Sequence, residues 1–279
     1  TEIYTILFVG SVRCVSETDD KMATLNSKIS KAIFAVVASF VVNLAWQNVW
    51  RITSLLDIPS QTVLNSSIRD LLMALSVFIV LSIVVKPQKE CLFLGLESNF
   101  AKGFLVAIIS VLPLYIVFPI IGTINPDLTF SLLVRKSLLP GFIEELLCRA
   151  FMFGLFFRYA KIGFFWATLF PAALFGLAHT YQGHDMISSL AAFGVTFIGA
   201  VYFSWMYVAW NFNLWVPIGL HILMNLAWFI FTMEGTENAA GGLISNIARV
   251  ISILLAVGLT IWYKRKNGTK VFSYTVWQL

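Results

Sequence analysis

Charged residues are scarce in this chain, and their scarcity decides its broad class. Asp, Glu, Lys and Arg make up 12% of the 279 residues, whereas soluble domains carry about 25%. Hydrophobic residues make up 59%, and the mean hydropathy is +0.85. These values exclude a soluble globular domain and indicate a protein that crosses a membrane several times.

Cysteine is also scarce, and a basic nucleic-acid-binding stripe is missing. The three cysteines, Cys14, Cys91 and Cys148, show no C-x-x-C spacing, which argues against a disulfide framework and against a thiolate metal site. The formal net charge is +5. Because the basic residues cluster at the ends of apolar segments, this charge does not indicate a nucleic-acid partner.

Long apolar runs occupy most of the chain. A transmembrane helix needs about 20 consecutive apolar residues. Eight segments meet this requirement to within a few residues: 32–50, 68–85, 103–122, 137–157, 162–180, 187–209, 214–233 and 243–263. The sequence therefore predicts an all-α fold, a polytopic membrane bundle of about eight transmembrane helices.

The distribution of lysine and arginine predicts how this bundle is oriented. With eight spans, the N-terminal stretch, the second and fourth loops and the C-terminal tail share one side, and they carry most of the basic residues. The other side is mainly acidic, with Arg51 and Arg69 as exceptions. Because cytoplasmic segments are enriched in Lys and Arg, we expect a multi-pass protein of the cell membrane with both termini in the cytoplasm.

The predicted spans divide the chain into four parts. Residues 1–31 form an N-terminal extension, within which residues 1–21 make a poor signal peptide and are interpreted as lying upstream of a natural start at Met22. Residues 32–134 hold the first transmembrane helices. Residues 135–232 hold the polar cluster described next, and residues 233–279 form the last transmembrane helix and a basic cytoplasmic tail.

Two adjacent glutamates and an arginine interrupt the fourth apolar run. A charge in hydrocarbon costs at least about 2.5–3.5 kcal/mol, so Glu144, Glu145 and Arg149 together indicate a functional site. On a helix, Glu145 and Arg149 share a face and can pair, whereas Glu144 is turned by about 100° from Glu145. We predict that Arg149 neutralises and orients Glu145, and that Glu144 faces the bundle interior as a base for water.

Later spans supply further polar groups. His221 and Asn225 are four residues apart on one face of the seventh span, and His179 follows Phe175 by four residues in the fifth span. Peptide hydrolysis needs a base for water and donors aimed at the tetrahedral oxygen. Glu144 would supply the base, and Asn225 with one histidine would supply the donors.

A proline precedes each of these clusters. Pro140, Pro171 and Pro217 either shape a wet cavity by opening kinks or are simply tolerated, as in other membrane helices. A break at Pro140-Gly141 would place Glu144 in the first turn of a new helix, where the helix dipole favours an ionised carboxylate.

Taken in order, the motifs Glu144-Glu145-x-x-x-Arg149, Phe175-x-x-x-His179 and His221-x-x-x-Asn225 resemble those of the CPBP family. This family of intramembrane proteases is named for CAAX processing and bacteriocin processing, and is also called Abi. The resemblance covers about residues 135–232, which we therefore expect to be the catalytic core, and no motif position is substituted.

The resemblance implies an all-helical membrane fold whose site opens to the cytoplasmic leaflet. It implies that Glu144 is the catalytic glutamate and that His179, His221 and Asn225 position the water and stabilise the oxyanion. It further implies that the residues matching Glu145 and Arg149 support the architecture.

Glu144, His179 and His221 also fit a His₂Glu zinc shell, and the family has often been labelled metalloprotease for that reason. The sequence contains no H-E-x-x-H helix. A zinc site would also need a second carboxylate as base, and Glu145 would have to release Arg149 to serve. We favour catalysis without a cofactor, with zinc on these three residues as the alternative.

The leading prediction is an intramembrane endopeptidase that acts in the lipid bilayer on a membrane-associated or prenylated peptide, such as a CAAX-type tail or a bacteriocin precursor. One alternative is a non-proteolytic bacteriocin immunity or scaffold protein that binds a peptide or a membrane protein. Another is a small transporter that uses Glu144 and the histidines as a proton relay. A transporter would be expected to show inverted repeats, and the sequence shows none.

Overall fold

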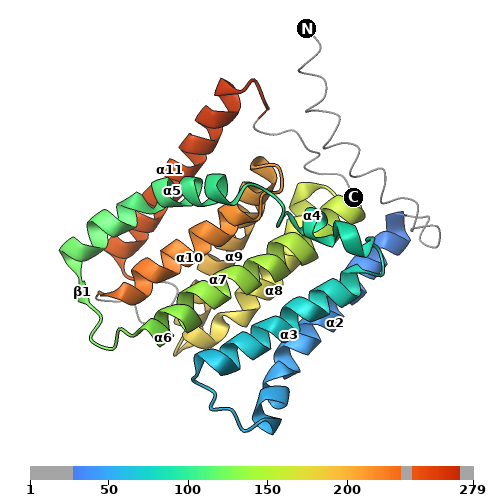
Figure 1. Ribbon diagram of the computed structural model, residues 1–279. Helices are drawn as coiled ribbons and strands as arrows, with labels where there is room; N and C mark the ends of the chain where they lie inside the picture. Colours follow the sequence, from blue (N-terminus) through green and yellow to red (C-terminus); the bar gives the residue numbers. More distant parts are fainter. Residues whose placement is uncertain (1–27, 234–240, 271–279) are drawn as a thin grey trace.

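In the computed structural model, the chain forms a bundle of helices that run up and down between two ends (Figure 1). The structure describes residues 28–233 and 241–270. The proposed extension up to residue 27, with the proposed start at Met22, lies outside the described residues. Residues 28–31, which the sequence assigned to that extension, form the first turn of a long helix.

Helices account for nearly all of the described chain. The long ones are α2 (Lys28–Leu55), α3 (Val63–Leu81), α5 (Phe100–Ile121), α8 (Phe164–Ala178), α9 (Met186–Ala209), α10 (Trp215–Ile230) and α11 (Leu243–Lys266). Three short helices lie in connections: η2 (Pro87–Lys89), α4 (Glu90–Leu94) and η6 (Thr180–Gln182).

One further helix carries both glutamates, and we call the continuous helical run 130–159 the glutamate helix. It alternates between α and π geometry: α6 (Phe130–Leu133), η3 (Val134–Leu138), α7 (Leu139–Glu145), η4 (Leu146–Phe153) and η5 (Leu155–Tyr159). Segments η3, η4 and η5 are π-helical. Such wide turns occur often at functional sites.

Each of the eight apolar segments picked from the sequence coincides with one of these helices. The chain is therefore a polytopic helical membrane protein. By length and apolarity, α2, α3, α5, α9 and α11 qualify as membrane spans, and α10 is a shorter apolar helix. The count of eight spans stays a prediction. Among the described residues, the one sheet is a two-stranded antiparallel pair of β1 (Thr123–Ile124) and β2 (Phe231–Thr232).

The predicted break at Pro140-Gly141 is wrong. The helix continues through both residues, and Glu144 lies near the middle of the glutamate helix. Proline interrupts one hydrogen bond of a helix, but neighbouring helices and local π adjustments compensate for that loss in membrane proteins. The dipole argument for Glu144 therefore falls away, because Glu144 is in no first turn.

The bundle has two ends that can be told apart by their contacts. At the first end, Lys102 Nζ lies 2.5 Å from the Tyr263 hydroxyl, and Arg158 contacts the Phe93 carbonyl. We call this the lysine-rich end. At the opposite end, β1 and β2 join the end of α5 to the end of α10.

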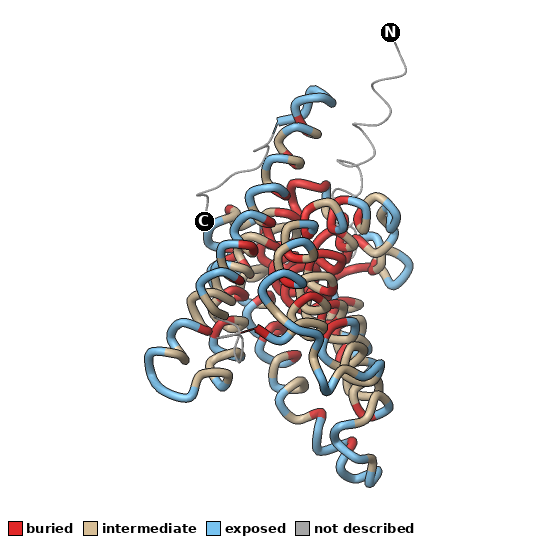
Figure 2. Tube along the Cα trace, turned by 90° about the vertical axis from the view of Figure 1, so that its left-hand side faces the viewer, coloured by how far each residue is buried: buried red, intermediate tan, exposed pale blue. Residues whose placement is uncertain are grey.

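Burial is uneven along the bundle. The buried positions of α9 and α10 gather mainly in the halves nearer the lysine-rich end, with few beyond Ala200 and Ile222. Every residue of the glutamate helix from Glu145 to Phe156 is buried, whereas only Ser137, Gly141 and Ile143 are buried between its start and Glu144. Figure 2 shows the buried positions gathered in the upper half of the molecule.

Candidate active site

Glu145 and Arg149 form a fully buried ion pair. Arg149 Nη1 lies 3.0 Å from Glu145 Oε1, and the two side chains are 1% and 0% exposed. The residues are one helical turn apart, so the pairing predicted from their spacing is confirmed. A buried charge without a partner costs several kcal/mol, and this pairing allows Glu145 to stay ionised in the core.

His221 joins the two adjacent glutamates. Its Nδ1 lies 2.7 Å from Glu145 Oε1, and its Nε2 lies 3.8 Å from Glu144 Oε2. Since Glu145 is held ionised by Arg149, it can only accept, so Nδ1 of His221 carries a hydrogen. The second ring nitrogen then faces Glu144, and one proton can be shared between Nε2 and that carboxyl group.

Glu144 occupies a different environment from its neighbour. Its side chain is 16% exposed, whereas that of Glu145 is fully buried. The 3.8 Å gap between Glu144 and His221 is longer than a hydrogen bond, so a small movement or one water is needed to link them. Glu144 is the acid that a substrate or a water molecule can reach.

Two aromatic rings enclose the Arg149 guanidinium. Its Cζ lies 4.5 Å from the centre of the Phe175 ring and 5.3 Å from that of Phe203. Apart from the contact with Glu145, the guanidinium nitrogens have no hydrogen-bond partner among the described residues. Cation–π attraction of this kind is strongest in desolvated places, so the two rings replace part of the solvation that Arg149 lacks.

Phe175 also holds His179. The two rings are 4.4 Å apart, and His179 Nδ1 lies 2.7 Å from the carbonyl oxygen of Phe175. A carbonyl oxygen only accepts, so Nδ1 carries the hydrogen and the neutral ring keeps its lone pair on Nε2. In the F-x-x-x-H motif, the ring of Phe175 therefore packs against Arg149, and its carbonyl fixes the tautomer of His179.

Asn225 is oriented by a carbonyl that a proline sets free. Pro140 has no N–H to give the carbonyl of Lys136, four residues earlier. That carbonyl accepts a hydrogen bond of 3.3 Å from Asn225 Nδ2 instead. The proline thus does not break the helix, and it offers no N–H that competes with Asn225 for this carbonyl.

A glycine allows the glutamate helix and α10 to approach each other. A Cβ at Gly141 would come within 2.5 Å of Ile222 Cγ1 and 3.0 Å of the Ile222 nitrogen. Because this position has no side chain, the backbone next to Ile222 can lie against α7. The adjacent residue, His221, is thereby brought to Glu145.

Comparisons with known proteins fit this geometry. Residues 126–227 match a family model described as Type II CAAX prenyl endopeptidase Rce1-like. This stretch includes all the site residues named above. The chain contains a domain of the Rce1-like CAAX prenyl endopeptidase family. The predicted resemblance to the CPBP/Abi proteases is therefore confirmed for this domain.

A relative supports the same assignment. The Bacillus subtilis (strain 168) protein named "Putative membrane peptidase YdiL" is 29% identical over 107 residues, which cover 38% of this chain and 39% of that protein. The match thus spans about two fifths of the length of the curated relative. No solved structure matches the chain.

In the Rce1-like domain, the structure brings Glu144, Glu145, Arg149 and His221 together directly. His179 joins them through Phe175, and Asn225 through the backbone of Lys136, as described above. All seven residues were chosen from the sequence. The chemical role of each remains a proposal.

Sequence reasoning missed two neighbours of the Rce1-like site. Phe203 of α9 contacts Arg149, and its ring centre lies 5.8 Å from that of His221. Nothing distinguishes this phenylalanine from the others in the sequence. Asp70 of α3 lies close enough to Glu144 for their charges to interact. As an acidic residue inside the predicted span 68–85, Asp70 could have been recognised from the sequence as a candidate site residue.

The zinc alternative can be compared with these positions. Both His179 and His221 use Nδ1 as a donor and leave Nε2 free, which is the usual arrangement of metal-binding histidines. Among the described residues, however, no three His, Cys, Asp or Glu side chains converge as a metal-binding group. The tautomers suit a zinc ion, and the choice between catalysis without a metal and zinc on Glu144, His179 and His221 stays a prediction.

Proposed function

We propose that this chain is an intramembrane endopeptidase, which hydrolyses a peptide bond of a membrane-associated or lipidated substrate with water activated by Glu144. One observation carries the proposal: two neighbouring glutamates lie in different environments and share His221. The buried one is neutralised by Arg149, and the partly exposed one pairs with no lysine or arginine among the described residues. The membership of residues 126–227 in an endopeptidase family supports the same reaction.

Glu144 acts as the general base. A carboxylate must lie within hydrogen-bond reach of the water that it deprotonates, and the partial exposure of Glu144 allows a water molecule to reach it. The resulting hydroxide attacks the carbonyl carbon of the substrate. The proton taken up by Glu144 is then available for the amine that leaves.

His221 takes part in this transfer through its Nε2 atom. Because Nδ1 donates to the ionised Glu145, the imidazole can accept a second proton and share its positive charge with that carboxylate. Glu145 therefore stabilises His221 as a cation during the reaction, in addition to its pairing with Arg149.

Asn225 and His179 have different roles in the proposal. The amide of Asn225 has a second N–H besides the one donated to Lys136, and this hydrogen stabilises the oxyanion. Neutral His179 offers a lone pair at Nε2, so it accepts a hydrogen bond from the attacking water. This assignment is narrower than the one implied by the family, where both histidines share both roles.

The proposal includes the setting of the enzyme. It is a multi-pass protein of the cell membrane with cytoplasmic termini, it works without a cofactor, and its partners are lipid and a peptide substrate. Residues 135–232 form its catalytic core. Catalysis by these residues does not require that the substrate be prenylated.

Replacing Glu144 by glutamine tests the function. Glu144→Gln keeps the shape of the side chain and removes the base, so the rate of peptide cleavage in detergent or proteoliposomes should fall by about 10²–10⁴-fold. The matched control is Glu97→Gln, a change of the same kind at an exposed residue in the connection between α4 and α5. The control should keep full activity.

The outcomes separate this function from its competitors. A folded Glu144→Gln protein that cleaves at the wild-type rate contradicts the role of Glu144. A wild-type protein that cleaves no peptide, yet still protects cells or binds a membrane partner when Glu144 is changed, favours the immunity or scaffold function. Thermal unfolding of each variant shows whether a loss of activity reflects chemistry or misfolding.

A further inference from the structure

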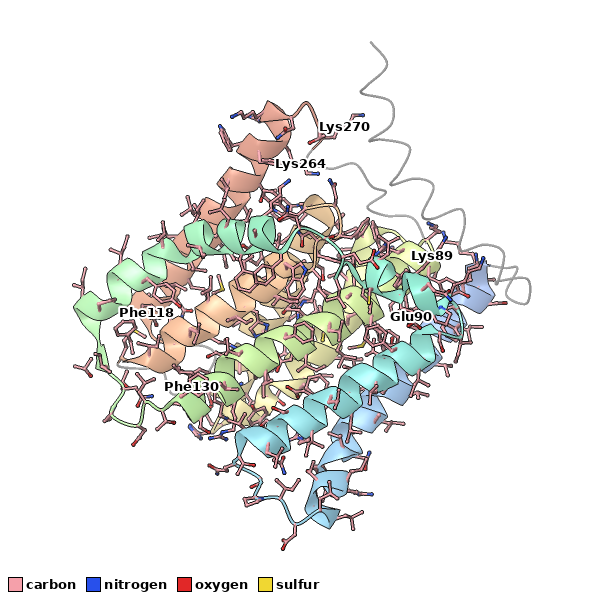
Figure 3. All side chains as sticks on the ribbon, viewed as in Figure 1. Lys89, Glu90, Phe118, Phe130, Lys264 and Lys270 are labelled. Carbon is pink, nitrogen blue, oxygen red and sulfur yellow. The ribbon has the colours of Figure 1, made fainter. Side chains whose placement is uncertain are left out.

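The two ends of the bundle differ in charge. Among the described residues, most lysines and arginines lie at the lysine-rich end, in the segments 28–31, 86–102, 158–161 and 264–270. In the half of the bundle nearer the opposite end there are five: Arg51, Arg69, Arg135, Lys136 and Arg249. Figure 3 shows Lys89 and Lys264 at one side of the molecule, and Phe118 and Phe130 at the other.

The connecting segments show the contrast more sharply. The four connections at the opposite end, 56–62, 122–129, 179–185 and 231–242, contain no lysine or arginine in their sequence. The positive-inside rule is a statement about such short loops and the helix ends beside them. It therefore places the lysine-rich end in the cytoplasm and the four basic-free connections on the extracytoplasmic side.

The site is closed toward the lysine-rich end. From Glu145 to Arg158 the glutamate helix runs through η4 and most of η5 toward the lysine-rich end. Its residues up to Phe156 are all buried, and Leu146, Leu147 and Phe151 belong to the largest hydrophobic cluster. A polar peptide cannot pass through a core packed at this density.

Toward the opposite end, more of the surface next to the site is exposed. Lys136 and Leu138 of the glutamate helix are exposed, as are Leu177 and Ala178 of α8 next to His179. The following residues also lie on the surface, with Tyr181 78% exposed. Glu144 is partly exposed while Glu145 is fully buried, so the change from closed to less closed packing falls between the two glutamates.

From these two observations we infer that the substrate reaches Glu144 from the extracytoplasmic side of the membrane. The inference rests on the proposed function and narrows its substrate class. The substrate is a membrane-anchored peptide whose cleaved bond lies in the outer half of the bilayer or at its outer surface, rather than a prenylated tail on the cytoplasmic side. The site opens away from the lysine-rich end, so a cytoplasmic lysine-rich end excludes a site that opens to the cytoplasm.

Cysteine labelling in intact cells tests the orientation without any need for activity. The full chain is produced with Cys14 and Cys91 replaced by alanine, and carries either Tyr181→Cys beside the site or Lys266→Cys at the lysine-rich end. Both positions are exposed. A membrane-impermeant maleimide should label Tyr181→Cys in intact cells, and Lys266→Cys only after permeabilisation. Any other pattern overturns the inference.

A second arm tests the substrate side. The enzyme is placed in proteoliposomes, and the fraction of each orientation is read from the same labelling. A mixed-sequence peptide with an acyl anchor is then added outside, and its cleavage should follow the fraction of enzyme with Tyr181→Cys outward. Cleavage that follows the Lys266→Cys fraction overturns the inference but supports the peptidase. If no cleavage is seen in any orientation, the proposed function fails, and with it the claim about the substrate.

Discussion

The two halves of the glutamate helix have the same apolar character in the sequence but opposite environments in the fold. Residues 130–144 are mostly exposed or half-buried, and residues 145–156 are all buried. The first half contacts α10 through Gly141, which lies against Ile222, and through the Lys136 carbonyl, which accepts a hydrogen bond from Asn225. The second half packs its side chains into the main core.

The comparison explains why two identical side chains have different duties. A carboxylate one residue inside the packed half must be neutralised, and Glu145 has Arg149 and His221 for that purpose. A carboxylate one residue outside it can exchange water and protons, as a base must. Changes to the packed half should therefore alter stability most, and changes to the open half should alter the rate.

The largest expected effect on stability comes from Glu145→Ala. This change leaves Arg149 charged and buried with no carboxylate, and breaking a buried pair by removing one member costs about 3–5 kcal/mol. It also removes the acceptor of His221 Nδ1, so activity should be lost as well. The midpoint of thermal unfolding in one detergent measures the first effect, and peptide cleavage measures the second.

A double variant sharpens this prediction. Replacing both charges, as in Glu145→Leu with Arg149→Met, removes the unpaired ion, and apolar replacements of a buried pair are often neutral for stability. We expect the double variant to recover most of the lost stability and none of the activity. If Glu145→Ala is as stable as wild type, or if Glu144→Ala is less stable than Glu145→Ala, the structural and catalytic roles of the two glutamates are assigned the wrong way round.

The next largest effect belongs to Asn225 in the open half. Asn225→Ala removes the proposed oxyanion donor, and loss of one such donor costs about 10²–10³-fold in rate. Stability should change little, since the amide is only half-buried. An unchanged kcat in a well-folded Asn225→Ala protein would remove Asn225 from the mechanism.

Pro140→Ala tests how Asn225 is positioned. An alanine at this position gives the Lys136 carbonyl a helical N–H, which competes with the Asn225 amide. The net value of a hydrogen bond is about 1 kcal/mol, so we expect kcat to fall by about fivefold while the protein becomes no less stable. Full activity in Pro140→Ala would show that Asn225 is held in place by other contacts.

Much of this site could be predicted from the sequence because membrane burial makes polar residues conspicuous. Glu144, Glu145, Arg149, His179, His221 and Asn225 all interrupt apolar runs, and helical spacing predicted the Glu145–Arg149 pair. The helix positions followed from hydropathy in the same way.

What could not be predicted depends on contacts between helices. The bridge from His221 to both glutamates requires the close approach at Gly141, which no spacing within one helix encodes. Phe203 is one aromatic residue among many, and its contact with Arg149 follows from how α9 packs. The helix continues through Pro140, and the Lys136 carbonyl that the proline cannot serve has a partner in α10; local propensity alone predicted a break.

A smaller effect is expected from Phe175→Leu. The change keeps an apolar side chain but removes the nearer ring over Arg149, and a desolvated cation–π contact is worth about 2 kcal/mol. The matched control is Phe170→Leu in the same helix, a half-buried ring that contacts Phe40 and Phe156. Thermal unfolding should shift more for Phe175→Leu than for the control, and equal shifts would remove the cation–π argument.

The smallest expected effect is that of removing metal ions. Glu144 and His221 are 3.8 Å apart at their nearest polar atoms, which is not far from the separation of two ligands on one zinc ion with bonds of about 2.0–2.2 Å. The difference between the two mechanisms therefore rests on His179. Its Nδ1 is hydrogen-bonded to the backbone of α8, and His179 does not form a group of three with Glu144 and His221 among the described residues.

If the open half works through water and protons alone, exhaustive chelation should leave kcat/KM unchanged. The metal content of the purified protein, measured by mass spectrometry, should then be well below one ion per chain. Loss of activity on chelation, restored by one equivalent of zinc but not in a His179→Ala variant, would show instead that α8 moves His179 into a metal site.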